Sequence, residues 1–141
     1  MSREAINLER SPKESICLNA VVATGAGTAL DVSEYDTILI MVASSATATA
    51  TIQIQGTGMQ TEPAWTTAQS ATNVWDYREI IDLEDGTVLD GDTGIAFSGT
   101  AVADTVRQFE LNCKSLTWVN ARVTAWTAEG LTVWIRPYKT T

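Results

Sequence analysis

The stretch "ATATATIQIQG", from Ala46 to Gly56, alternates between two kinds of side chain without a break. Alanine and isoleucine occupy the even positions up to Ile54, and threonine and glutamine occupy the odd positions up to Gln55. Successive side chains of an extended chain point to opposite faces, so the apolar set shares one face and the polar set the other. The pattern predicts a β-strand with one face in the core and one in water.

Other strand-like segments lie on either side of this stretch. "TILIMVA" at 37–43 directly precedes it, and the break at Ser44 and Ser45 predicts a tight turn or a bulge, giving two paired strands or one long bent strand. Further strands are predicted in "SICLNAVVA", in "VRQFELNC" and, in preference to a short helix, in "VWDYREIIDL". "TGAGTAL" reads as a turn, and residues 56–73 read as a long loop.

The last third of the chain carries a second clear alternation. Aliphatic residues recur at every other position over 119–125 and again over 131–135, with a turn at 128–130 between them. This predicts a C-terminal β-hairpin.

Roughly seven to nine short strands, separated by Gly, Asp, Ser and Thr clusters, indicate an all-β fold. We expect a single antiparallel β-sandwich or jelly-roll-like domain at residues 15–141. Residues 1–14 hold six charged residues and a proline without a clean period, and predict an extended N-terminal arm. The arm is either a frayed terminus or a segment that orders against a neighbouring subunit, to which Ile6 and Leu8 offer apolar contacts.

The composition of the chain argues against several classes of function. The chain has 141 residues, enough for one domain with its own core, and a formal net charge of −8, which repels phosphate backbones. Its longest apolar run, residues 38–43, is far shorter than the roughly 20 residues of a membrane-spanning helix. The first residues do not read as a secretory signal, so we expect folding in a cytoplasm, without direct contact to nucleic acid or membrane.

The sequence contains few of the residues and motifs that catalysis requires. The chain has no histidine, which removes the usual general base and the commonest metal ligand. "TGAGTAL" lacks the third glycine and the lysine of phosphate-binding loops. We therefore expect no enzyme activity, no catalytic residue and no cofactor. Cys17 and Cys113 stand in apolar surroundings without metal-type spacing, and predict two buried thiols in preference to a disulfide.

One acidic stretch, "DLEDGTVLDGDTG", allows three interpretations. Asp-Gly pairs are typical of tight turns in solvent, which is the preferred interpretation. Oxygen-rich loops also bind Ca²⁺, although this spacing does not match an EF-hand, and a carboxylate pair could serve a glycosidase. The weak calcium candidates are Asp82, Glu84, Asp85, Asp90 and Asp92.

Tryptophan and arginine gather near the predicted hairpin. Trp126 and Trp134 fall opposite the aliphatic stripe, so they are expected on the face away from the core. Three alternatives remain for that face. The domain itself covers it, or it forms a subunit interface, or it stacks on sugars. Aromatic residues and arginine are enriched in subunit interfaces. Under the interface hypothesis, the candidate contact residues are Ile6, Leu8, Trp118, Arg122, Trp126, Trp134 and Arg136.

Two segments resemble small β-sandwich proteins of tailed-phage virions. They are "AVVATGAGTALDVSEYDTILIMVASSATATATIQIQG" and "VNARVTAWTAEGLTVWIRPY", which together cover roughly half of the chain. The resemblance implies a structural virion protein, most like a capsid decoration (cement) protein that forms a homo-oligomer, with a trimer favoured. Such a protein binds the major capsid protein on the outer capsid surface after synthesis in the host bacterial cytoplasm. Residues 59–113 depart from that pattern.

A second function remains open at the level of the sequence. A receptor- or glycan-binding β-module of a phage tail fibre or baseplate would use the same sandwich with exposed aromatic rings. The acidic stretch with Trp65 or Trp75 would then carry the binding site.

Overall fold

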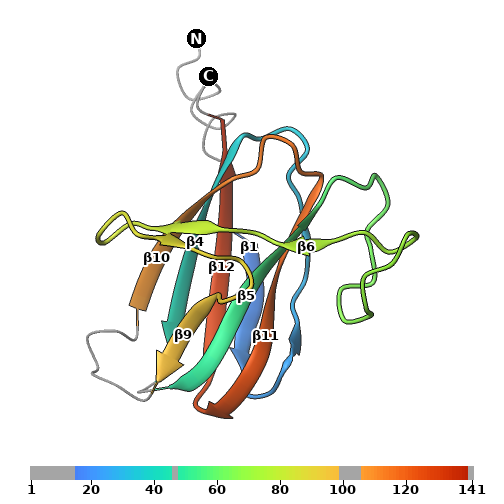
Figure 1. The fold of residues 1–141 in the computed structure, drawn as a ribbon. Helices are drawn as coiled ribbons and strands as arrows, with labels where there is room; N and C mark the ends of the chain where they lie inside the picture. Colours follow the sequence, from blue (N-terminus) through green and yellow to red (C-terminus); the bar gives the residue numbers. More distant parts are fainter. Residues whose placement is uncertain (1–14, 46–47, 99–105, 140–141) are drawn as a thin grey trace.

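The computed structural model describes residues 15–45, 48–98 and 106–139, and within them it is built of β-strands and connecting loops (Figure 1). The strands form two antiparallel sheets that pack face to face. This confirms the predicted all-β sandwich. The described residues hold more strands than the sequence predicted, because β2, β3, β6 and β8 are only two residues long.

The first sheet, here called sheet A, has six strands. In spatial order they are β1 (Ser15–Val21), β12 (Leu131–Tyr138), β4 (Thr37–Ser44), β10 (Val106–Asn112), β7 (Ile80–Asp82) and β8 (Val88–Leu89).

The second sheet, sheet B, is centred on two long strands that pair with each other. Its members are β2 (Gly25–Ala26), β11 (Trp118–Ala128), β5 (Thr49–Thr57) and β6 (Asp76–Tyr77), with β3 (Leu30–Asp31) paired to β11 and β9 (Ile95–Ser98) paired to β5. The turn predicted at "TGAGTAL" therefore contains β2, which pairs with β11.

The predicted C-terminal hairpin is wrong. β11 and β12 both form, but β11 pairs with β5 in sheet B while β12 pairs with β4 in sheet A. The chain crosses the sandwich between them because the aliphatic residues of both strands face one core from opposite sides. The same holds for β4 and β5, which are neither paired with each other nor one bent strand.

The two crossings lie side by side and are hydrogen-bonded to each other. Ser45 N–H donates to the Gly130 carbonyl at 2.9 Å, and Gly130 N–H donates to Ser45 Oγ at 3.1 Å. Ser45 Oγ in turn donates to Glu129 Oε2 at 3.0 Å. Glu129 has a φ of 74°, a left-handed backbone that tightens this turn.

The core fills the space between the sheets with aliphatic side chains and two phenylalanines, Phe97 and Phe109. Phe109 of β10 is fully buried. Alternate residues of four strands join it, as their sequence pattern predicts. They include Ile38, Ile40, Val42, Ile52, Ile54, Val119, Ala121, Val123, Leu131, Val133 and Ile135.

The opening stretch is a strand, but its polar face is not in water. Gln53 and Gln55 are 7% and 0% exposed. Gln53 Nε2 donates to the carbonyls of Gly91 and Asp92 at 2.9 Å each, and Gln55 Nε2 donates to the Trp65 carbonyl at 2.8 Å. The half-buried strand that the sequence predicted is therefore covered on both faces, because two loops fold over it. Ala46 and Thr47 lie outside the described residues.

Two further expectations can be compared with the structure. Cys17 and Cys113 are free, buried thiols, as predicted. Within the described ranges, no helix is long and apolar enough to span a membrane.

We predict that Ser45→Ala lowers the free energy of unfolding by about 1 kcal/mol, because it removes the hydroxyl that joins the two crossings. Urea unfolding measures the change. A double-mutant cycle with Glu129→Ala is the control, and it should give a coupling energy of about 0.5 kcal/mol. Independent, additive effects would contradict a direct link between the two turns.

Candidate interaction surface

The outer face of sheet A is a broad surface that, among the described residues, no loop covers as one covers sheet B. Register places Trp134 of β12 next to Met41 of β4, and Met41 next to Gln108 of β10. Ile16 of β1 pairs with Trp134 on the other side. These residues share the outward face because their neighbours along each strand point into the core.

Large apolar side chains are exposed across this outer face. Ile16 is 50% exposed, Ile81 40%, Leu83 46% and Val106 65%. Scattered apolar residues are ordinary on protein surfaces, but a contiguous set marks a contact site. A groove of about 470 Å³ runs through the set, and it is lined by Met41, Val42, Ala43, Val106, Gln108 and Trp134.

A row of opposite charges crosses the same face. Arg136 pairs with Leu39, and Leu39 pairs with Glu110, so the two charges lie on the strands that flank β4. Tyr138 Oη donates to Glu110 Oε2 at 3.4 Å. Burial, and then the Glu110 carboxylate, raise the pKa of Tyr138, while Arg136 opposes the rise.

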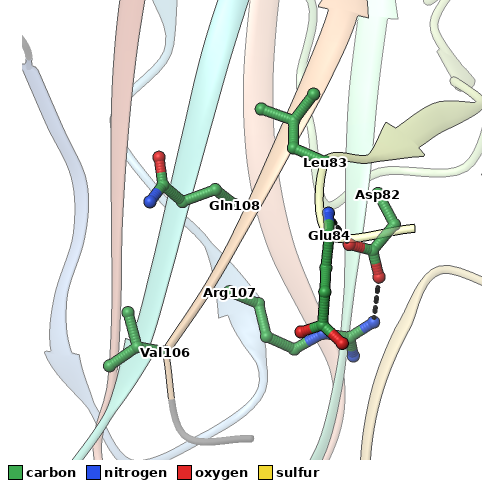
Figure 2. Close-up of a pocket in the computed structure, with 6 residues that line it drawn as sticks. All are labelled: Asp82, Leu83, Glu84, Val106, Arg107 and Gln108. Carbon is green, nitrogen blue, oxygen red and sulfur yellow. Dashed lines mark hydrogen bonds and ion pairs between the residues drawn. The ribbon is translucent and has the colours of Figure 1, made fainter. Parts of the chain in front are cut away.

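A smaller polar pocket lies at the edge of this face, between β10 and the end of β7 (Figure 2). Arg107 Nη2 forms an ion pair with Asp82 Oδ2 at 2.9 Å, and its guanidinium carbon lies 5.0 Å from the centre of the Phe109 ring. The side chains of Arg107 and Asp82 are 23% and 12% exposed. Both side chains line a cavity of about 260 Å³.

The outer face of sheet B is covered by the chain itself. Residues 58–75, green in Figure 1, form the loop predicted from the sequence. Arg122 Nη1 donates to the Trp65 carbonyl at 3.4 Å and to Tyr77 Oη at 3.3 Å, and Trp118 Nε1 donates to the Gln60 carbonyl at 3.1 Å. Both side chains thus hold this loop in place.

The loop encloses its own tryptophans. Trp65 and Trp75 are each 6% exposed. Their indole N–H groups donate to Glu62 Oε2 and to the Thr67 carbonyl. Neither ring offers the open face on which a sugar would stack, so the residues expected to carry glycan binding are unsuited to it.

The expectation that Trp126 faces away from the core is wrong. Register shifts on both sides of Trp126 show irregular pairing between β11 and β5, and Trp126 lies opposite Ala50, a core residue. An irregularity of this kind breaks the alternation of faces. Trp126 packs against the core, and its Nε1 donates to the Glu129 carbonyl at 2.7 Å.

The acidic stretch forms turns. Asp82, Asp85 and Asp90 each accept a hydrogen bond through Oδ1 from the backbone N–H two residues further on. The arrangement is the one that Asp favours in turns. No group of three or more acidic or cysteine side chains within the described ranges could hold a metal ion, so Glu84 and Asp92 do not join the others in a calcium site.

The structure divides the predicted interface residues among several places. Trp134 and Arg136 lie on the outer face of sheet A, Trp118 and Arg122 on that of sheet B, and Trp126 at the core. Ile6 and Leu8 lie outside the described residues. The sequence reasoning missed Met41, Val106 and Glu110. Apolar residues on both faces of "TILIMVA" were the available signal for an apolar outer face.

Comparison with known proteins adds one fold likeness. No protein-family model matches the sequence, and no curated protein matches it. The crystal structure of the SPBc2 prophage-derived protein YomS has a similar fold, with a TM-score of 0.64. The alignment covers 89% of this chain and 91% of that chain at 10% sequence identity. At this identity the likeness establishes a shared fold.

We predict that substitutions of Trp134 and Trp126 differ in their effect on stability. Trp134→Ala should change the free energy of unfolding by less than about 1 kcal/mol, because the ring lies outside the core. Trp126→Ala should cost about 2 kcal/mol or more, through lost packing and a lost hydrogen bond. Denaturant unfolding of both variants tests this, and equal effects would contradict the assigned faces.

We also predict a loss of stability at alkaline pH. Burial raises the pKa of Cys17 and of Cys113 from 9.0 to about 11. Above pH 9 the unfolded chain releases thiol protons that the folded chain retains, so this contribution to stability is present below pH 9 and is lost toward pH 11. We expect a loss on the order of 1 kcal/mol at pH 10 for Cys17, measured by urea unfolding. In Cys17→Ala, the control, the decline should be smaller; an equal decline would contradict the assignment to this thiol.

Proposed function

We propose that this chain is a structural protein of a phage particle, which decorates the outside of the capsid and stabilises it by bridging shell subunits. In this proposal the rigid sandwich presents an adhesive face, and the protein performs no reaction. The exposed apolar outer face of sheet A is the observation that carries the proposal.

The contrast between the two outer faces supports an adhesive role. The loop of residues 58–75 packs on the outer face of sheet B, whereas Ile16, Leu83 and Val106 remain exposed on sheet A. Leaving such a surface in water is unfavourable by roughly 25 cal/mol for each Å² of apolar area. Contact with another protein removes that cost.

The fold likeness supports a phage origin. YomS is a prophage-derived protein, and the alignment spans most of both chains. Together with the sequence segments that resemble virion β-sandwich proteins, it favours a structural protein of a phage particle. The burial of Trp65 and Trp75 weakens the glycan-binding alternative further.

Three features support a role without catalysis. The chain has no histidine. Burial raises the pKa of Cys17 and Cys113 to about 11, so their thiolates are scarce at neutral pH. Asp82 is held by Arg107, and Asp90 caps a turn. None of these groups is placed as a free nucleophile or base.

Stabilisation by bridging follows from linkage. A protein that binds the assembled shell, but not its separate subunits, shifts the equilibrium toward the shell. The N-terminal arm, residues 1–14, precedes β1 at one edge of sheet A and offers Ile6 and Leu8 to the major capsid protein. The outer face of sheet A would then join decorating subunits to one another.

We predict that deletion of residues 1–14 weakens attachment to the capsid at least tenfold and leaves the domain folded, because the core lies within residues 15–139. Co-sedimentation with capsids from the encoding phage, prepared without this chain, measures attachment. Far-UV circular dichroism and the unfolding midpoint verify the fold.

Val74→Ser is a matched control, because Val74 is 51% exposed but belongs to the loop over sheet B. It should attach like the full chain. Capsids that do not bind the full chain at all would overturn the proposed function. Equal binding of the truncated and full chains would remove the role of the arm.

A further inference from the structure

The charges on the outer face of sheet A are arranged in a self-complementary way. β12 and β10 lie on either side of β4, and register places Arg136 and Glu110 at the same height along it, with Leu39 between them. Arg136 has neither a hydrogen bond nor an ion pair with another described residue. Arg136 and Glu110 thus offer a cation and an anion at equal distances from the central strand, and Glu79 and Lys114 line a pocket together with Glu110.

The apolar side chains follow the same arrangement. Two residues further along β4, on the same outer face, Trp134 and Gln108 flank Met41. One strand further out lie Ile16 of β1 and Leu83, whose N–H donates to the Gln108 carbonyl. Apolar residues thus stand on both sides of β4, and the groove runs along that strand.

We propose that the occupant of this face is a second copy of the chain, related by a two-fold axis that runs along β4 in the plane of contact. Such an axis exchanges the positions of β12 and β10. Arg136 then lies opposite Glu110 of the second copy, and the same contact occurs a second time by symmetry. This is the isologous arrangement that two-fold dimers use.

The axis also brings apolar groups together. Leu39 and Met41 meet their own counterparts on the axis, and Ile16 lies opposite Leu83 of the second copy. The opposite charges pair while the apolar row between them leaves water. A two-fold axis perpendicular to the strands would instead place each strand opposite its own counterpart. Arg136 of β12 would then not lie opposite Glu110 of β10 in the second copy.

The size of the face sets the expected strength. Five strands at about 4.8 Å spacing, and about 24 Å along β4, give roughly 600 Å² on each copy. This lies at the low end of specific protein interfaces. We therefore expect a dimer that dissociates at concentrations on the order of micromolar, and assembles fully where many copies are held close together on one particle.

The inference rests on the proposed function, since it names the partner of the same face, but it is tested in solution without capsids. Sedimentation of the full chain over about 1 to 200 µM should show a monomer–dimer equilibrium. Arg136→Glu and Glu110→Arg should each weaken the dimer at least tenfold, because each places like charges opposite each other twice. The double variant should restore it.

A crosslinking variant tests the position of the axis. Met41→Cys should be crosslinked to its own counterpart by a bis-maleimide that spans roughly 10 Å, because the two residues meet on the axis, facing sheets lie about 10 Å apart, beyond the reach of a disulfide, and the native thiols are buried. Val74→Cys, which is 51% exposed on the other side of the molecule, should not be crosslinked into a dimer. These measurements do not depend on whether the charge variants fold.

A chain that is monomeric at the highest concentration would overturn the inference. So would a double variant that does not recover, or a Met41→Cys variant that fails to crosslink. A monomer that still attaches to capsids, and loses attachment with Arg136→Glu, would assign the face to the shell protein and retain the proposed function. A dimer that binds no capsid would retain the inference and reject the function.

Discussion

The hydrogen bonds between Ser45 and the turn at Glu129 and Gly130 join two of the connections between the sheets of this protein. Two strand pairs, β4 with β12 and β5 with β11, lie in different sheets, and the connections from β4 to β5 and from β11 to β12 occur at this one place. Trp126 adds to the joint, since its indole N–H donates to the Glu129 carbonyl.

The outward side chains of each sheet determine what its outer face presents. On sheet B the outward glutamines of β5 and Arg122 of β11 bind the overlying loops, so that face becomes part of the interior. On sheet A the outward side of β4 carries Leu39 and Met41, which form no hydrogen bonds to hold a loop. One sheet is thus closed by its own chain, and the other remains open for a partner.

Periodicity predicted the strands well and their pairing poorly. The alternation at 46–56 and at 119–135 identifies extended chain, but a hairpin and a sheet-crossing turn share the same short polar connection, so "AEG" at 128–130 could not distinguish them. Burial of Gln53 and Gln55 depends on two loops that fold back from later in the chain. The face of Trp126 depends on irregular pairing that leaves no mark in the residue types. Of the predicted interface residues that the structure describes, only Trp134 and Arg136 lie on the outer face of sheet A, because the positions of the others depend on these long-range contacts.

We propose an inert scaffold whose outer face of sheet A adheres to other proteins of a phage particle. A cryo-electron microscopy reconstruction of particles with and without this chain tests that proposal most directly. We expect added density on the outside of the capsid, with the outer face of sheet A buried in a protein contact. Identical reconstructions, density at the tail, or a sandwich whose sheet A faces solvent would contradict it.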